Sequence, residues 1–99
     1  MSNETFGDYI KQAREIMKLP LRKVAAHLDI DTSTLSKVER GDRPASPDYL
    51  KPLADILQLD LKEVQSKFIA DKINKDFGDM EHLTDGLKAA EQQIKKRKK

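Results

Sequence analysis

The chain contains no cysteine and no tryptophan, and only 5% of its 99 residues are aromatic. Without cysteine, disulfides, thiolate catalysis and cysteine-ligated zinc are excluded. The two histidines, His27 and His82, lie far apart in the sequence, and neither has a nucleophile or a metal ligand at a useful spacing. We therefore expect neither a metal site nor a cofactor.

Long hydrophobic runs and glycine-rich loops are also missing. No apolar run approaches the roughly 20 residues that cross a bilayer, and the first residues, MSNETFGDY, lack the basic and hydrophobic regions of a signal peptide. The four glycines stand singly, so no loop is suited to cradle a phosphate. These absences predict a soluble, cytoplasmic protein that is not an enzyme.

The chain is long enough for one small helical domain with an appendage. Hydrophobic residues make up 37% of it, which suffices for a compact core but not for a large cavity. Residues 1–60 carry 9 Lys and Arg against 10 Asp and Glu, a net charge of −1, and residues 61–99 carry 10 against 7, a net charge of +3. The last five residues, KKRKK, contribute +5, so the body of the chain is not uniformly basic.

Residues 20–41, PLRKVAAHLDIDTSTLSKVERG, form the most informative segment. Its apolar positions recur at helical spacing, first over one short stretch and again after a polar turn: Val24, Ala25, Leu28, Leu35 and Val38. Two short helices of this kind can share one apolar seam. The small side chain of Ala25 lets the second helix cross the first closely. The segment therefore predicts a helix-turn-helix.

The turn and the ends of the second helix carry their own signals. Asp29 occupies a position that usually needs a left-handed backbone, which aspartate tolerates better than most residues. Asp31 is placed to cap the second helix by accepting a hydrogen bond from the amide of Thr34. Gly41 provides a stop after the basic residues of the last turn. The second helix is thus expected to begin at about Thr32 and to end before Gly41.

This segment resembles the Xre/Cro family of helix-turn-helix regulators, which have a lambda-repressor-like DNA-binding domain. The resemblance covers roughly residues 6–64 and is carried by eight positions: Leu19, Val24, Ala25, Leu28, Ile30, Ser36, Glu39 and Gly41. It implies an all-α fold with a five-helix domain, and a transcriptional regulator, such as a repressor, that binds double-stranded DNA as a homodimer on an inverted-repeat operator. The small size and helical tail are also similar to the controller proteins of restriction-modification systems.

Two features depart from the family pattern. Pro20 and Leu21 stand where the family usually has a Thr-Gln or Ser-Gln pair that contacts the DNA backbone, and neither side chain can make that hydrogen bond. Asp29 replaces the usual glycine and adds a negative charge, which costs little if its side chain points away from DNA.

The resemblance also assigns roles to individual residues. The base-reading positions correspond to Thr32, Ser33 and Lys37, because hydroxyl groups can bond several base edges and lysine favours guanine O6 and N7. The clustering of cations and the resemblance together indicate contacts with DNA phosphates at Arg22, Lys23, Thr34, Arg40 and Arg43. Arg14 and Glu39 match a family ion pair that ties the first helix to the third.

One further helix is expected before this segment and one after it. The first begins at Thr5, and Asp8 completes a capping box with it. A fourth helix follows the loop GDRPASP. Ser46 is suited to cap it, unless Pro52 delays the start of the helix to about Asp48 and so lies in its first turn.

The last third of the chain continues the helical pattern. Asp60 and Glu63 resemble a second capping pair, at the start of a fifth helix that Gly78 ends. Later apolar residues recur at spacings of four, three and four and mark a sixth amphipathic helix: Leu83, Leu87, Ala90 and Ile94. These two helices carry more apolar residues than a five-helix core needs, and we interpret six of them as a dimerisation surface: Phe68, Ile73, Phe77, Leu83, Leu87 and Ile94. The alternative is that the sixth helix packs back on the fifth helix of its own chain.

These observations divide the chain into three parts. Residues 1–66 form the DNA-binding domain, residues 67–94 form a helical extension that serves dimerisation, and residues 95–99 form a basic tail. The tail is expected either to attract DNA of any sequence or only to keep the protein soluble. The competing function is that of an antitoxin or another protein-interaction module built on the same fold. Its C-terminal segment would then bind a protein partner.

Overall fold

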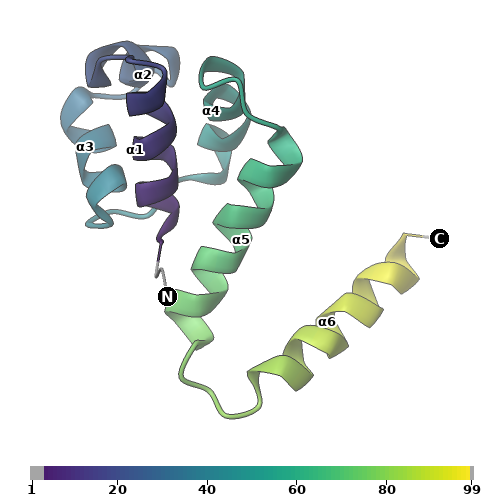
Figure 1. The fold of residues 1–99 in the computed structure, drawn as a ribbon. Helices are drawn as coiled ribbons and strands as arrows, with labels where there is room; N and C mark the ends of the chain where they lie inside the picture. The colour runs from purple at the N-terminus through teal and green to yellow at the C-terminus, as the bar shows by residue number, and fades with distance from the viewer. Residues whose placement is uncertain (1–3, 99) are drawn as a thin grey trace.

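The structure, a computed structural model, describes residues 4–98, which form six α-helices and one short 3-10 helix but no strand. The elements are α1 (Phe6–Ile16), α2 (Leu21–His27), α3 (Thr32–Arg40), η1 (Pro47–Tyr49), α4 (Leu50–Ile56), α5 (Leu61–Phe77) and α6 (Leu83–Arg97). Helices α1 to α4 pack together with the first half of α5, and α6 extends from the end of α5 as a separate arm (Figure 1). The expected all-α fold with an extra C-terminal helix is confirmed. Within the described part of the chain, no helix is both long and apolar enough to span a bilayer.

The start of α1 and the end of α3 follow the local signals. The Thr5 hydroxyl accepts a hydrogen bond from the amide of Asp8 at 3.1 Å, and the Asp8 carboxylate accepts one from the amide of Thr5 at 3.2 Å. The expected capping box is therefore present. Gly41 ends α3 with φ of 82°, a left-handed conformation that glycine adopts at no steric cost.

Three short helices end on a non-glycine residue in the left-handed region. Lys18, Asp29 and Gln58 have φ of 57°, 59° and 54°, and each follows the C-cap residue of α1, α2 or α4. This conformation lets the next amide bond back into the helix, as the amide of Ile30 does to the carbonyl of Ala25 at 3.0 Å. The prediction for Asp29 is confirmed, whereas nothing in the sequence distinguished Lys18 and Gln58.

Other helix starts differ in detail from the expectations. Asp31 is the N-cap of α3, but its side chain makes no capping hydrogen bond. The Asp60 carboxylate does cap α5, through the amide of Lys62 at 3.1 Å, but Glu63 does not reciprocate. Glu63 instead accepts a hydrogen bond from the hydroxyl of Tyr9 at 2.7 Å. The prediction of a capping hydrogen bond from Asp31 was therefore wrong, and the pair of Asp60 and Glu63 was right only at Asp60, because Tyr9 engages Glu63.

The point at which α4 begins explains how the helix accommodates Pro52. Ser46 caps the 3-10 helix η1, where its hydroxyl accepts from the amide of Asp48 at 3.3 Å. The α-helix begins after it, at Leu50, so Pro52 lies in the first turn of α4. Amides in the first turn have no partner within the helix, so the proline removes no helical hydrogen bond there.

One hydrophobic core lies among α1 to α5. Its buried members are Phe6, Ile10, Val24, Ala25, Leu28, Leu35, Val38, Leu50, Leu53, Ala54, Leu57 and Val64. Phe68 packs on the edge of this core, where its ring meets that of Phe6 at 5.5 Å between centroids and an angle of 80°. Because Phe68 is covered by its own chain, we remove it from the predicted dimerisation surface.

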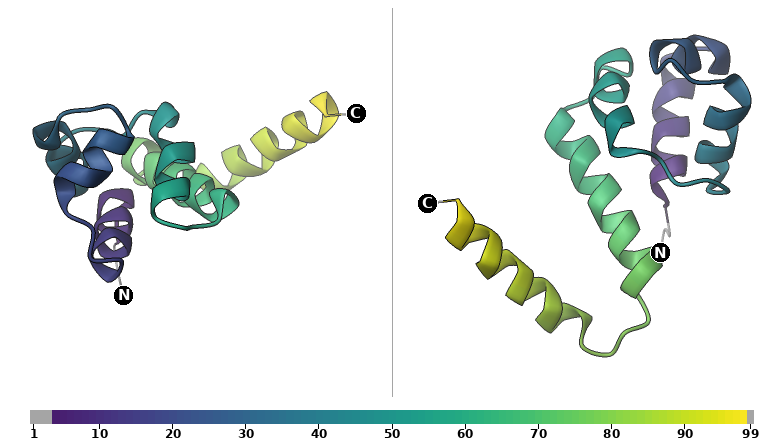
Figure 2. Two further views of the ribbon diagram at one scale, coloured as in Figure 1. Left: turned by 90° about the horizontal axis from the view of Figure 1, so that it is seen from above. Right: turned by 180° about the vertical axis from the view of Figure 1, so that it is seen from behind.

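The predicted division of the chain needs revision at its boundaries. Helix α5 runs without a break through residues 66 and 67, so no structural boundary lies there. Helix α6 continues to Arg97, so residues 95–97 are helical rather than a free tail. Residues 1–3 of the predicted domain and Lys99 of the predicted tail lie outside the described residues. Helix α6 has no buried residue and diverges from α5 in every view, which argues against packing along α5 of its own chain (Figure 2).

Candidate nucleic-acid interface

Helix α3 buries one face and exposes the other. Leu35, Val38 and Glu39 are buried, while Thr32, Ser33 and Lys37 are exposed. Within residues 4–98, no side-chain hydrogen bond engages these three exposed residues. The predicted base-reading side chains are therefore gathered on one helical face and are free to bond an external partner.

An ion pair fixes this helix against α1. Arg14 donates from Nε to Glu39 Oε2 at 2.8 Å, from Nη2 to Glu39 Oε1 at 3.0 Å and from Nη1 to the Leu19 carbonyl at 3.0 Å. The hydrogen bonding that Arg14 donates to Glu39 raises the pKa of Arg14 above its ordinary value. The predicted pair is present. It is bidentate, and Glu39 is only 5% exposed, and both properties make such a pair strong.

A close backbone approach adds to this attachment. At Gly7, near the start of α1, an added Cβ atom would collide with the backbone carbonyl oxygens of Val38 and Glu39. Only glycine lets α1 come this close to the end of α3. The sequence contains no local signal for this role, because the contact joins segments far apart in the chain.

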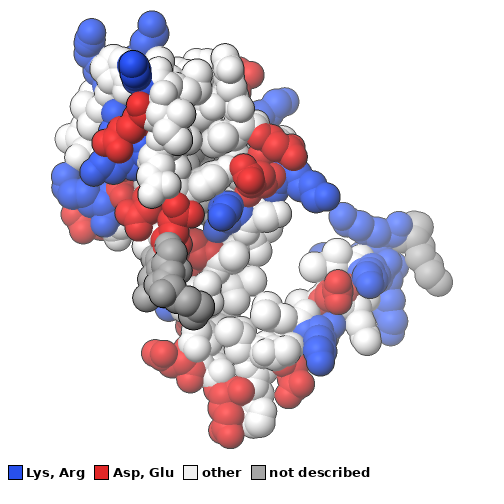
Figure 3. All heavy atoms as spheres, viewed as in Figure 1, with Lys and Arg blue, Asp and Glu red and all other residues white. Residues whose placement is uncertain are grey.

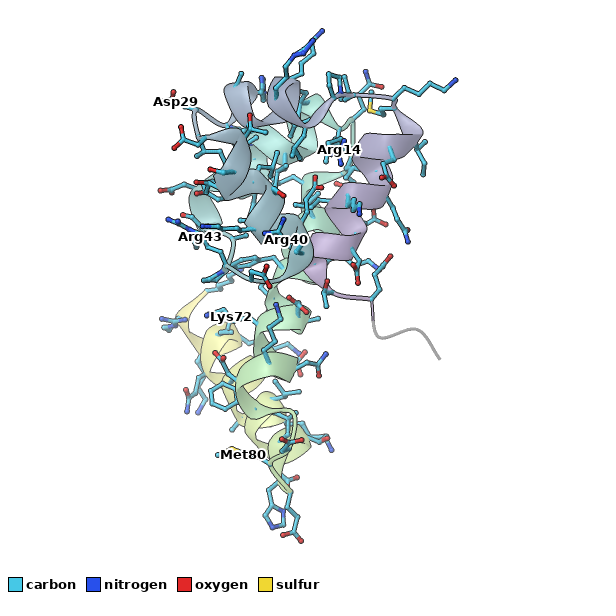
Figure 4. All side chains as sticks on the ribbon, turned by 90° about the vertical axis from the view of Figure 1, so that its left-hand side faces the viewer. Arg14, Asp29, Arg40, Arg43, Lys72 and Met80 are labelled. Atoms are coloured by element: carbon cyan, nitrogen blue, oxygen red, sulfur yellow. The ribbon has the colours of Figure 1, made fainter. Side chains whose placement is uncertain are left out.

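The predicted phosphate contacts fall into two groups. Arg22, Lys23 and Arg43 are exposed, and no ion pair with another described residue engages them. Arg40 differs, because its Nη1 donates to the Ser36 hydroxyl at 2.8 Å and its Nε donates to Asp42 at 3.1 Å. Figure 4 shows Arg40 and Arg43 on the side of the molecule that carries α3. A phosphate contact by Arg40 would have to share its guanidinium with Asp42.

The first turn of α2 bears out the departure from the family pattern. Pro20 is the N-cap residue and makes no side-chain capping hydrogen bond. Leu21 is half-buried against the core. At this end of α2, the side chains predicted to contact phosphate are the exposed cations Arg22 and Lys23.

A hollow of about 470 Å³ lies between the turn and the loop after α3. It brings together Thr34 and Arg43, both predicted phosphate contacts, with Tyr49, which was not predicted. Asp29 and Asp31 line the same hollow. Asp29 thus lines the same hollow as two residues that are predicted to contact phosphate.

Two lysines of α5 extend this surface and were missed from the sequence. Lys72 and Lys75 line a hollow of about 230 Å³ together with Arg43, and Figure 4 shows Lys72 below Arg43 on the same side. In the sequence they look like ordinary helix-surface pairs, and in the structure they do contact Asp76 at 3.7 Å and Asp71 at 3.1 Å. Only the fold places them beside the loop that follows α3.

The comparisons with known proteins agree with this geometry. A helix-turn-helix family pattern matches residues 10–64, which run from α1 into the first turn of α5. The match includes every predicted DNA-contacting residue and both members of the ion pair between Arg14 and Glu39. A search of curated proteins found no match to the chain.

Proposed function

The chain belongs to the helix-turn-helix family of the Xre/Cro, lambda-repressor-like type, and on this premise we propose that it acts as a homodimer on an inverted-repeat operator. Membership itself implies a non-enzymatic protein that binds DNA and regulates transcription. The proposal adds the oligomeric state, the symmetry of the site and the residues that read it.

The observation that carries the proposal is the exposed face of α3. Thr32, Ser33 and Lys37 lie on it without partners among residues 4–98, and the ion pair between Arg14 and Glu39 holds the helix in place. A helix presented in this way fits the major groove, where hydroxyl and ammonium groups can meet base edges. We assign base contacts to these three residues.

Phosphate contacts are assigned to the cations and the hydroxyl around this helix. Arg22 and Lys23 lie at the start of α2, and Thr34 and Arg43 line one hollow beside α3. We keep Arg40 as a weaker candidate because Asp42 already holds it. Such contacts position the protein on DNA and make its affinity depend on salt.

Selection of binding sites from random duplexes with the full chain tests this proposal. The selected sites are expected to be inverted repeats. Lys37→Ala should weaken the selected site by about tenfold to a hundredfold and relax the preference at one base pair of each half-site. Lys51→Ala on α4 removes the same charge from another helix and should leave the preference intact. Selection of an unrepeated site, or of no consensus, would contradict the proposal.

A protein-interaction module, such as an antitoxin, is the second candidate. It is favoured by the carboxylates of Asp29 and Asp31 beside the candidate interface and by the uncovered apolar side chains at the C-terminal end. This function predicts that the selection yields no consensus while the exposed apolar side chains remain necessary in the cell.

A further inference from the structure

The C-terminal third of the chain separates its charges. Between residues 76 and 85, which we call the elbow, the sequence has four carboxylates and no lysine or arginine: Asp76, Asp79, Glu81 and Asp85. Residues 86–98, which follow the elbow and include most of α6, have a single carboxylate, that of Glu91. They have five cations: Lys88, Lys95, Lys96, Arg97 and Lys98. Figure 3 shows acidic side chains around the elbow and basic side chains toward the far end of the arm.

An open apolar groove lies between the end of α5 and the start of α6. It has a volume of about 630 Å³ and is lined by Ile73, Phe77, Met80, Leu83, Leu87 and Ala90 among others. Of the large hydrophobic side chains that are exposed in residues 4–98, several lie here or next to it. Phe77 is 47% exposed, Met80 63%, and Leu87 and Ile94 42% each. An uncovered apolar surface of this kind marks an interface.

We propose that α6 of a second copy of the chain fills this groove and runs antiparallel to the first α6. The proposal rests on the homodimer of the proposed function and adds the direction of the helices. In an antiparallel pair, the basic end of each arm lies over the acidic elbow of the other copy, and two-fold symmetry makes this contact twice. A parallel pair would instead set elbow against elbow and basic end against basic end, which like charges oppose.

The apolar seam gives a register that agrees with the charges. When Leu83 of one copy lies opposite Ile94 of the other, Leu87 lies opposite Ala90. The same offset brings the basic last turn of one α6, which ends at Arg97, to the start of the other α6, where the turn that carries Glu81 precedes the helix. The apolar pattern is therefore compatible with the antiparallel arrangement, and the charge pattern selects it over the parallel one.

Among residues 4–98, the acidic elbow has one ion pair with a lysine or arginine, the exposed contact of Asp76 with Lys72 at 3.7 Å. His82 is the only base that contacts Glu81 or Asp85 among the described residues, at 3.9 Å and 3.7 Å, and both contacts are exposed to solvent. The basic end of α6 is equally free of the candidate DNA interface, because all views place it on the opposite side of the molecule from α3 (Figures 1 and 2). Of the two roles expected for the basic tail, attraction of DNA or solubility alone, this position of residues 95–98 does not favour contact with DNA bound by the same protomer.

Three full-length variants test the direction of the helices. The elbow-reversed chain carries Asp79→Lys, Glu81→Lys and Asp85→Lys, and the arm-reversed chain carries Lys95→Glu, Lys96→Glu and Arg97→Glu. The charge-swapped chain carries all six changes and keeps the net charge of +2, because the two sets of three reversals cancel. Circular dichroism checks that each variant retains its helices.

Sedimentation at low salt measures how strongly each chain dimerises. Each reversed chain alone should dimerise about tenfold or more weakly than the natural chain, because every elbow then faces a like charge. The charge-swapped chain should dimerise as the natural chain does, but a mixture of the two should contain almost only homodimers. Heterodimers in that mixture would show a parallel arrangement and overturn the proposal. Equal dimerisation of all four chains would also overturn it while leaving the homodimer intact, and a monomeric natural chain would refute both.

Discussion

Glu39 is the buried carboxylate of the core, and its position depends on a single partner. The side chain is 5% exposed, and Arg14 donates two hydrogen bonds to it from the neighbouring helix. A buried charge of this kind is tolerated only while its counter-charge remains, because desolvation is expensive for either ion alone. The pair thus positions α3 and makes the fold sensitive to the loss of one member.

Glu39→Ala should destabilise the protein by roughly 2–4 kcal/mol, because it leaves the Arg14 guanidinium without its partner. Denaturant unfolding of the natural and variant chains measures the loss. Replacing both residues by methionine should recover much of the stability, since neither charge then remains buried. An unchanged melting temperature for Glu39→Ala would contradict the structural role of the pair.

Asp29 combines backbone strain with an unfavourable charge. Its φ of 59° favours glycine, and it lines the same hollow as Thr34 and Arg43 in the candidate interface. Asp29→Gly should therefore stabilise the fold by about 0.5–1 kcal/mol and tighten DNA binding at low salt. Asp29→Asn should reproduce the tighter binding with a smaller gain in stability.

Gln58→Gly serves as the control for Asp29, because its φ of 54° gives the same strain at the end of α4. It should raise the melting temperature without changing the affinity for DNA. If it tightens DNA binding as much as Asp29→Gly does, the relief of backbone strain rather than the loss of charge is responsible.

Gly7 and Gly86 offer a matched pair of substitutions. A Cβ atom at Gly7 meets the backbone of Val38 and Glu39, whereas one at Gly86 meets nothing within 4 Å. Gly7→Ala should destabilise the fold by about 1–3 kcal/mol, because α1 and α3 must move apart. Gly86→Ala should leave the unfolding of the α1 to α5 domain unchanged, and calorimetry of both variants measures the difference.

At the scale of elements, the sequence predicted which helices exist better than it predicted what covers them. The seam shared by α2 and α3, the left-handed turn and the stop at Gly41 are all local patterns, and they were recovered. Phe68 and Phe77 have the same helical periodicity, yet only Phe68 meets a partner, the ring of Phe6. Periodicity identifies an apolar face, but the neighbour that buries it comes from another part of the chain.

The same limit applies to the candidate site. Thr32, Ser33 and Lys37 were found because they share one exposed face of a recognisable helix. Lys72 and Lys75 were missed because α5 approaches the loop after α3 only in three dimensions. Long-range placement of this kind leaves no periodic trace in the sequence.

Tyr9 ties α1 to α5 and gives this contact a pH dependence. Burial, followed by the hydrogen bond to Glu63, raises the pKa of Tyr9 well above its ordinary value, and Lys67 lies 5.3 Å from the centre of its ring. The folded protein therefore holds the phenolic proton at a pH where the unfolded chain releases it, near pH 10. The contribution to stability is complete below about pH 10 and decreases as the pH rises above it.

Tyr9→Phe should remove part of this alkaline loss of stability. Its melting temperature should be lower than that of the natural chain at neutral pH, and the difference should shrink above about pH 10. Tyr49→Phe removes a phenol elsewhere and controls for general effects of the substitution. A constant difference between Tyr9→Phe and the natural chain across this range would argue against the linkage.

At the scale of the whole molecule, the two proposed interfaces lie on opposite sides. Helix α3 faces one way and the arm leaves the domain on the other side, so a contact between arms leaves both α3 helices uncovered (Figure 1). Dimerisation and DNA binding can then occur together without competing for surface. The arm is also separable in principle, because α6 contributes no buried residue to the core.

Removal of the arm should therefore separate folding from specific binding. A chain ended after Gly78 keeps Phe68 on the core and is expected to fold, but to be monomeric. One recognition helix covers only a few base pairs, whereas a two-fold dimer sets two helices about 34 Å apart, one turn of the duplex. The shortened chain should lose most of its specific affinity and retain weak, salt-dependent binding, while the full chain protects two half-sites in footprinting. If the shortened chain still dimerises in sedimentation, or binds the full operator as tightly as the complete chain, the arm does not hold the dimer and α5 or the domain itself must do so.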